Sequence, residues 1–190
     1  MPLHDVSESI GRNKRSFHAG FTPGIRETVL VQKIKVYFID LSISNKTRHT
    51  CDIVEKLYEQ GFSVTVFTKD SSQKHTLDRM LWTWKQESFI PHTTEIDPDS
   101  DTDEAVLLTE QEDLPVRTDA VVLYDPLPPE KLHKYQLVVD FAEVYDKARL
   151  QKSRQRFKQL RDIGEFELEY LKLGEFLGKE LAYHPVKQTS

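Results

Sequence analysis

From Lys33 onward the chain alternates between segments typical of β-strands and segments typical of helices. The run KIKVYFIDL at 33–41 is rich in β-branched and aromatic residues, which favours a buried strand. A helical pattern follows at 48–61, where apolar side chains recur at helical spacing and Gly61 supplies a left-handed residue at the end. A second strand at 62–69 comes directly after it. This alternation predicts right-handed crossovers and hence a mostly parallel sheet.

The same alternation continues as far as residue 163. A second helix should begin at Asp70 or Ser72 and end before Pro91, which returns the chain to an extended conformation. The further elements expected are strands at 104–110, 119–125 and 136–141, a proline-opened helical turn at 126–135 and a strong helix at 147–163. The sequence therefore predicts a three-layer α/β domain with a mostly parallel sheet of about five strands.

The two ends of the chain differ from this regular middle. Residues 1–31 mix Gly, Ser, Pro, Arg and Lys without periodicity, so we expect a flexible N-terminal extension. The α/β domain should occupy 32–166, a size that suits one domain. The C-terminal tail, 167–190, carries large apolar side chains such as Leu168 and Phe176, and part of it should pack on the domain.

Composition excludes several classes of protein. The chain is 38% hydrophobic and 30% charged, and no apolar run approaches the roughly 18 to 20 residues of a membrane-spanning helix. Its N-terminus lacks the apolar core of a secretory signal. Cys51 is the only cysteine, which excludes an internal disulfide and a zinc site of paired thiolates. We therefore expect a cytoplasmic protein without membrane contact.

Two enzymatic interpretations of an α/β sheet can be tested on the sequence. Nucleotides bind such sheets through glycine-rich loops, yet the segment 40–49 between the first strand and its helix contains no glycine, so no cofactor is expected. A divalent-metal phosphoesterase could instead use Asp40, Asp125 and Asp140, which end three strands. Aspartate is also favoured at turns and helix starts, and no histidine cluster accompanies these three. We therefore expect no metal site, with the phosphoesterase as an alternative.

Charge is unevenly distributed along the chain. The net charge of −5 argues against general attraction to nucleic acid, and the acidic run at 95–104 suits a solvated loop. The expected helix at 147–163 is strongly basic instead. At 100° per residue its cations form one stripe: Lys147, Arg154, Lys158 and Arg161.

Phe157 lies at the border between this stripe and an apolar line formed by Leu150 and Leu160. A solvated amphipathic helix is the simplest interpretation. However, cations unopposed by acids and next to an aromatic ring suit an acidic peptide, because guanidinium groups pair with carboxylates while the ring accepts an apolar side chain. The same stripe would suit phosphates, so direct binding of single-stranded nucleic acid remains an alternative.

Three motifs give the chain a family resemblance. They are LDRMLWTWKQESFIPH at 77–92, VVDF at 138–141 and RFKQLRDIGEF at 156–166. In this order they resemble blocks of the chi subunit of the bacterial DNA polymerase III holoenzyme, an accessory protein of the clamp loader. The resemblance covers roughly 33–166 and implies a Rossmann-like fold without a nucleotide-binding loop, and no catalysis.

The resemblance also implies partners and a binding site. Chi proteins bind the acidic C-terminal tail of single-stranded DNA-binding protein, pair in many bacteria with a psi subunit, and have a repair helicase as a further partner, so contact with DNA would be indirect. By position the tail-binding residues fall on Arg154, Phe157 and Lys158. The family's aromatic is typically tyrosine, so Phe157 lacks a hydroxyl donor. The family has a further cation earlier in this helix. It matches Lys147 or Arg149, depending on where one alignment gap is placed, and the helical wheel favours Lys147.

The resemblance assigns the tryptophan-rich motif to a second interface. In the family this region supplies apolar surface that faces a partner, so Trp82, Phe89 and Pro91 are the candidates for docking psi or a helicase. The alternative is that Leu81 and Trp84 belong to the core while Trp82 merely fills a groove. Aromatic residues dominate both cores and interfaces, so spacing alone does not separate these interpretations.

Overall fold

The computed structural model describes residues 33–85, 88–95, 105–113 and 118–182. In chain order the elements are β1 (Ile34–Leu41), α1 (Lys46–Glu59), β2 (Val64–Phe67), α2 (Ser71–Trp82), β3 (His92–Thr93), β4 (Val106–Thr109), β5 (Ala120–Leu123), the 3-10 turn η1 (Pro129–Lys131), β6 (Leu137–Glu143), α3 (Lys147–Ile163), β7 (Phe166–Lys172) and α4 (Leu173–Gly178). The expected N-terminal extension and nearly all of the acidic run lie outside the described residues.

The strands form one sheet in the order β3-β4-β2-β5-β6-β1-β7, and every pair is parallel. This confirms the α/β fold, with seven strands where the sequence indicated about five. The two additional strands are β3, which is only two residues long, and β7, which pairs with β1 from Ile34 opposite Phe166. Because β7 begins at Phe166, the division suggested between domain and tail falls within a strand.

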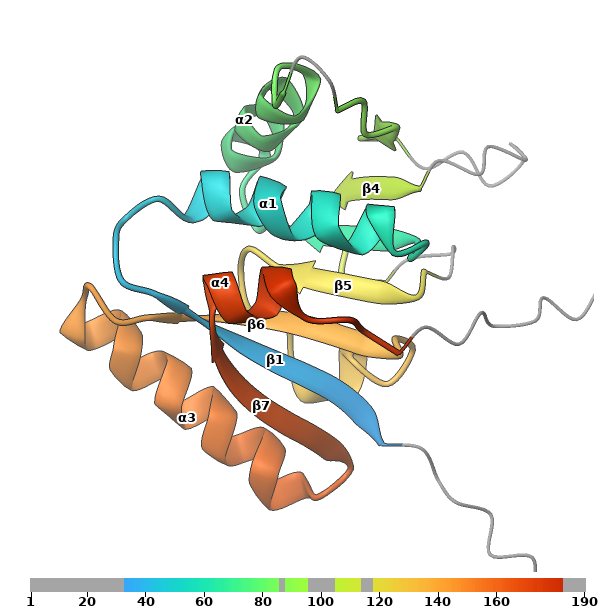
Figure 1. The fold of residues 1–190 in the computed structure, drawn as a ribbon. Helices are drawn as coiled ribbons and strands as arrows, with labels where there is room; N and C mark the ends of the chain where they lie inside the picture. Colours follow the sequence, from blue (N-terminus) through green and yellow to red (C-terminus); the bar gives the residue numbers. More distant parts are fainter. Residues whose placement is uncertain (1–32, 86–87, 96–104, 114–117, 183–190) are drawn as a thin grey trace, which may run out of the picture. The chain divides into compact units, whose positions relative to one another are not determined.

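Helices cover both faces of the sheet, as the three-layer prediction requires (Figure 1). One core cluster joins one face to α1, α2 and α4 through Leu57, Leu77 and Phe176. The other cluster joins the opposite face to η1 and α3 through Leu132 and Leu160. Successive residues of a strand point to opposite faces, which is how β1 contributes to both clusters.

The ends of the helices follow the local sequence. Asp70 caps α2 and accepts hydrogen bonds from the backbone N–H groups of Ser72 and Gln73, which confirms one of the two starts predicted. Gly61 has a φ of 85°, as expected of a residue that ends a helix in the left-handed conformation. Within the described residues no helix has the length and apolar character that crossing a bilayer requires.

Candidate functional site

The basic helix α3 is held against the sheet by one side only. Leu160 is buried in the core, and the Ser153 hydroxyl donates to the Phe141 carbonyl oxygen at 2.9 Å. Phe157 is half-buried and meets the ring of Phe38 edge-on, with the two centroids 5.1 Å apart. The position and orientation of α3 are therefore fixed, and its outer side is left to solvent.

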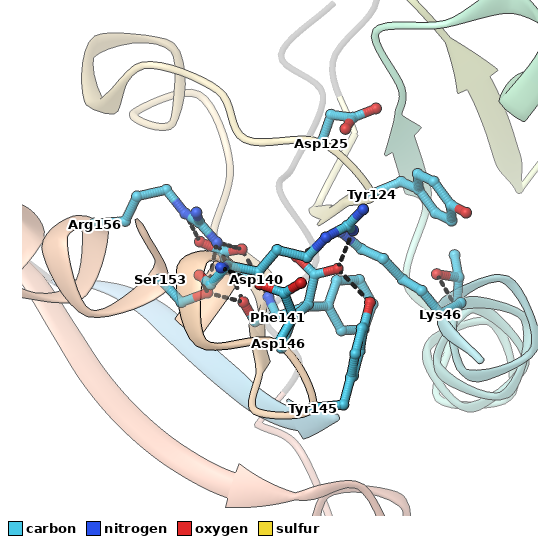
Figure 2. Close-up of polar contacts among 12 residues, drawn as sticks. Lys46, Tyr124, Asp125, Asp140, Phe141, Tyr145, Asp146, Ser153 and Arg156 are labelled. Atoms are coloured by element: carbon cyan, nitrogen blue, oxygen red, sulfur yellow. Dashed lines mark hydrogen bonds and ion pairs between the residues drawn. The ribbon is translucent and has the colours of Figure 1, made fainter. Parts of the chain in front are cut away.

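One arginine of α3 serves the fold. The Arg156 guanidinium forms two hydrogen bonds with the Asp140 carboxylate, at 2.7 and 2.8 Å, and a third at 3.2 Å with the Phe141 carbonyl oxygen (Figure 2). Burial disfavours the charged guanidinium, but the pairing with Asp140 outweighs it and raises the pKa of Arg156. The sequence did not reveal this role, although a carboxylate within a buried strand signals the need for a cation.

The first turn of α3 contains a second, more exposed pair. Arg149 donates to Glu143 Oε1 at 2.8 Å, and the Tyr145 hydroxyl donates to the same oxygen at 2.8 Å. The Arg149 side chain is thus partly engaged, although more than half of its surface is exposed. Lys147 is exposed and forms no ion pair with the residues that the structure describes, so of the two alternative cations it is the freer one.

The structure brings together the three residues that the family resemblance assigned to tail binding. Phe157 and Lys158 follow Arg154 by three and four residues on α3, so both neighbour Arg154 on the helix surface. Both cations are exposed, and neither has an ion-pair partner in the described part of the chain. An aromatic ring thus lies at the border of a stripe that contains two uncommitted cations.

The structure adds a residue that the sequence did not single out. Tyr170 of β7 is half exposed, and its hydroxyl donates to Asp40 Oδ2 at 2.7 Å. Burial and the Asp40 carboxylate raise the pKa of Tyr170 to about 12, against the opposing charge of Arg154. Tyr170 is within electrostatic reach of Arg154 and belongs to β7, a strand that packs on α3 and that the sequence did not predict.

The two tryptophans have different environments. Trp84 is half-buried against the core and its indole N–H donates to Glu55 Oε2 at 3.2 Å, while Leu81 is buried. Trp82, the last residue of α2, is 61% exposed, and Phe89 is 67% exposed. Trp82 therefore lies on the surface and does not fill a groove.

Trp82 and Phe89 form one exposed aromatic surface. Their ring centroids are 6.0 Å apart, and the Trp82 ring lies 4.9 Å from that of His92, which is buried beneath it. The Nδ1 atom of His92 is 2.7 Å from the Ile90 carbonyl oxygen, which holds the imidazole in place. Pro91, the third residue assigned to this interface, is only partly exposed. We call Trp82, Phe89 and Pro91 the tryptophan surface.

The three aspartates of the alternative metal site do not converge. Asp40 accepts from Tyr170, Asp125 accepts from the Lys69 backbone N–H at 2.9 Å, and Asp140 is paired with Arg156. Among the described residues no group of three acidic, histidine or cysteine side chains is arranged to hold a metal ion. The geometry therefore gives the phosphoesterase alternative no support.

These features define a class of protein. A parallel sheet with helices on both faces, and a first strand–helix connection without glycine, is a Rossmann-like α/β domain lacking the usual phosphate loop. The family model described as "DNA polymerase III chi subunit, HolC" matches residues 34–167, more than two thirds of the chain. The chain belongs to this family, whose members are named as subunits of a replicative DNA polymerase.

Two curated relatives carry the same family name. A probable DNA polymerase III subunit chi from Rickettsia prowazekii (strain Madrid E) is 28% identical over 74 residues, which cover 39% of this chain and 44% of the relative. The DNA polymerase III subunit chi of Pseudomonas aeruginosa (strain PAO1) is 36% identical over 50 residues, 26% of this chain and 35% of the relative. The matched segments thus span less than half of either relative.

A solved structure shares the fold alone. The crystal structure of T4 UvsW superposes with a TM-score of 0.55 at 12% identity, over 74% of this chain and 42% of that one. Identity this low shows a common architecture and carries no functional conclusion.

Proposed function

We propose that this protein is a non-catalytic, cytoplasmic adaptor in DNA replication. Its α3 surface binds the acidic C-terminal tail of single-stranded DNA-binding protein, and the tryptophan surface docks on the psi subunit of the clamp loader or on a repair helicase. The observation that carries the tail-binding proposal is the placement of Phe157 at the border of a stripe that contains two uncommitted cations, Arg154 and Lys158.

The chemistry of this surface fits an acidic peptide that ends in an apolar residue. A guanidinium pairs with a carboxylate through two parallel hydrogen bonds, and the lysine ammonium adds a second positive charge. The ring of Phe157 offers a half-buried apolar edge to the terminal side chain. Ser153, Arg156 and Leu160 fix α3 on the sheet. The helix therefore loses little conformational freedom when a peptide binds.

The tryptophan surface fits a protein partner. Exposed aromatic residues are enriched at interface hot spots, and two of them pack together here while more than 60% of each residue is open to solvent. Leu81 and Trp84 attach the same segment to the core, so the surface is presented on a fixed support. Pro91 contributes a partly exposed flank to it.

Titration calorimetry with a short acidic, aromatic-terminated tail peptide tests the α3 assignment. The peptide should bind more weakly as the salt concentration rises. Arg154→Glu should reduce the binding free energy of the peptide by about 1 to 3 kcal/mol. Lys152→Glu is the matched control, because Lys152 is an exposed cation of the same helix about 160° around the axis from Arg154.

Equal losses in both variants would show that only the overall charge matters, and no loss in either would place the tail site elsewhere. Binding of a bare single-stranded oligonucleotide that is lost in Arg154→Glu would favour the direct nucleic-acid alternative instead.

A further inference from the structure

A polar pocket with a volume of about 290 Å³ lies beyond the carboxyl ends of the central strands. Its walls are residues 44–47 at the start of α1, Gln73 of α2, the two residues that follow β5, Tyr145 after β6 and Arg149 of α3. The lining is almost entirely polar, so the pocket suits a ligand rich in charged and hydrogen-bonding groups.

The pocket occupies the topological switch point of the sheet. Strands β1 and β6 are neighbours, yet α1 leaves β1 for one face and α3 leaves β6 for the other (Figure 1). Where connections diverge in this way, a crevice opens outside the carboxyl ends of the strands, and ligands of open parallel sheets bind there. The pocket is therefore in the position where an α/β sheet can best hold a ligand.

Two cations reach this pocket from opposite helices. The Lys46 side chain of α1 is 15% exposed; its ammonium lies 5.1 Å from the ring centres of Tyr124 and Phe141 and 3.7 Å from Glu143 (Figure 2). Burial lowers the pKa of Lys46 despite nearby carboxylates, so an additional anion would stabilise its charged form. Arg149 of α3 provides the second cation. Both cations also contact Glu143, and Asp125 is the one acid of the lining.

Two further features indicate what the ligand offers. The Asn45 side chain makes no capping hydrogen bond at the start of α1, and the first turn holds no acidic residue, so its backbone N–H groups are available to an anion. The Gln73 side-chain oxygen is buried and has no hydrogen-bond partner. A buried acceptor left unpaired is costly, and a ligand hydroxyl would satisfy it.

We propose that this pocket binds the phosphate of a small hydroxylated phosphomonoester, of the kind represented by a sugar phosphate. The phosphate lies between Lys46, Arg149 and the start of α1, and hydroxyl groups donate to Gln73 and Asp125. Side chains supply the donors that a glycine-rich loop supplies elsewhere. The proposal does not rest on the adaptor function, although Arg149 is also one of the two alternative tail-binding cations.

Calorimetric titration of the full chain with ribose 5-phosphate, inorganic phosphate and ribose tests the proposal. Ribose 5-phosphate should bind saturably and more tightly than phosphate, and ribose should not bind. Gln73→Glu adds a negative charge to the pocket without removing packing, and its repulsion of the phosphate should weaken the binding of ribose 5-phosphate by about tenfold or more. Gln159→Glu is the matched control, an exposed glutamine on α3 roughly 15 Å beyond Arg149 along the axis.

A second variant distinguishes a loss of binding from a folding defect. Lys46→Met removes the ammonium but keeps an apolar stem on the rings of Tyr124 and Phe141, and it should lose binding to a similar extent while circular dichroism stays unchanged. The proposal is overturned if no phosphate compound binds, if both glutamate variants weaken binding equally, or if inorganic phosphate binds as tightly as ribose 5-phosphate.

Discussion

Replacing Arg156 by methionine should destabilise the fold by about 3 kcal/mol, because it leaves the Asp140 carboxylate buried without its cation. Removing one partner of a buried ion pair typically costs about 3–5 kcal/mol. The Asp140 side chain is 4% exposed and that of Arg156 is 22% exposed, so solvent relieves part of the penalty and the lower end of the range applies. Methionine retains most of the apolar stem, so the charge is the main loss.

Urea unfolding followed by circular dichroism measures this cost. Lys152→Met is the control, because Lys152 is an exposed cation of the same helix and the change should stay within about 0.5 kcal/mol. Adding Asp140→Leu to Arg156→Met should recover part of the loss, since the unpaired charge is then gone. If Arg156→Met costs less than about 1 kcal/mol, the pair does not hold α3 on the sheet.

Two further predictions concern the tryptophan surface and the loss of folding stability at acid pH. Leu81→Ala should lower the free energy of unfolding in urea by about 2–5 kcal/mol and Trp82→Ala by under about 1 kcal/mol, because of these two residues only Leu81 is buried. Equal losses in the two variants would contradict the placement of Trp82 on the surface. Burial favours a raised pKa at Glu143, but Lys46, Tyr145 and Arg149 outweigh it and lower the pKa below the ordinary 4.5. The stability that Glu143 contributes is therefore present above about pH 4.5 and is lost as pH falls through the lowered pKa. In Glu143→Gln the midpoint of urea unfolding should therefore fall less between pH 5 and 3 than in the parent protein. An equal fall of the midpoint in both proteins would refute this.

The sequence predicted those parts of the fold that local pattern determines. The basic helix begins and ends where expected, because the acidic cap Asp146 and the left-handed Gly164 enclose it. By contrast, β7 at the edge of the sheet carries the alternation of glutamate and apolar residues that is typical of a strand, although the prediction placed this segment in the C-terminal tail. Strand β3 has two residues, too few for any period to be visible.

The candidate sites were predictable to a similar extent. The helical wheel was sufficient to place Arg154 and Lys158 on the outer side of α3, and both are exposed. The tryptophans could not be assigned by spacing, because α2 ends at Trp82 and Trp84 therefore does not follow the helical period. The pairing of Arg156 depends on the register of α3 against β6, which no local pattern contains.

The proposed adaptor function requires that two partners bind at once, and the sheet separates the two surfaces. Helix α2, which ends in Trp82, packs on β3 and β4, whereas α3 packs on β6 and β7. β3 and β7 are the opposite edges of the sheet, six strand spacings apart, which corresponds to about 29 Å at about 4.8 Å per spacing. A short peptide on α3 therefore does not reach the tryptophan surface. Screening by salt over about 10 Å also isolates the charges of α3 from a partner at the other edge. Occupancy of one surface should consequently leave the affinity of the other unchanged.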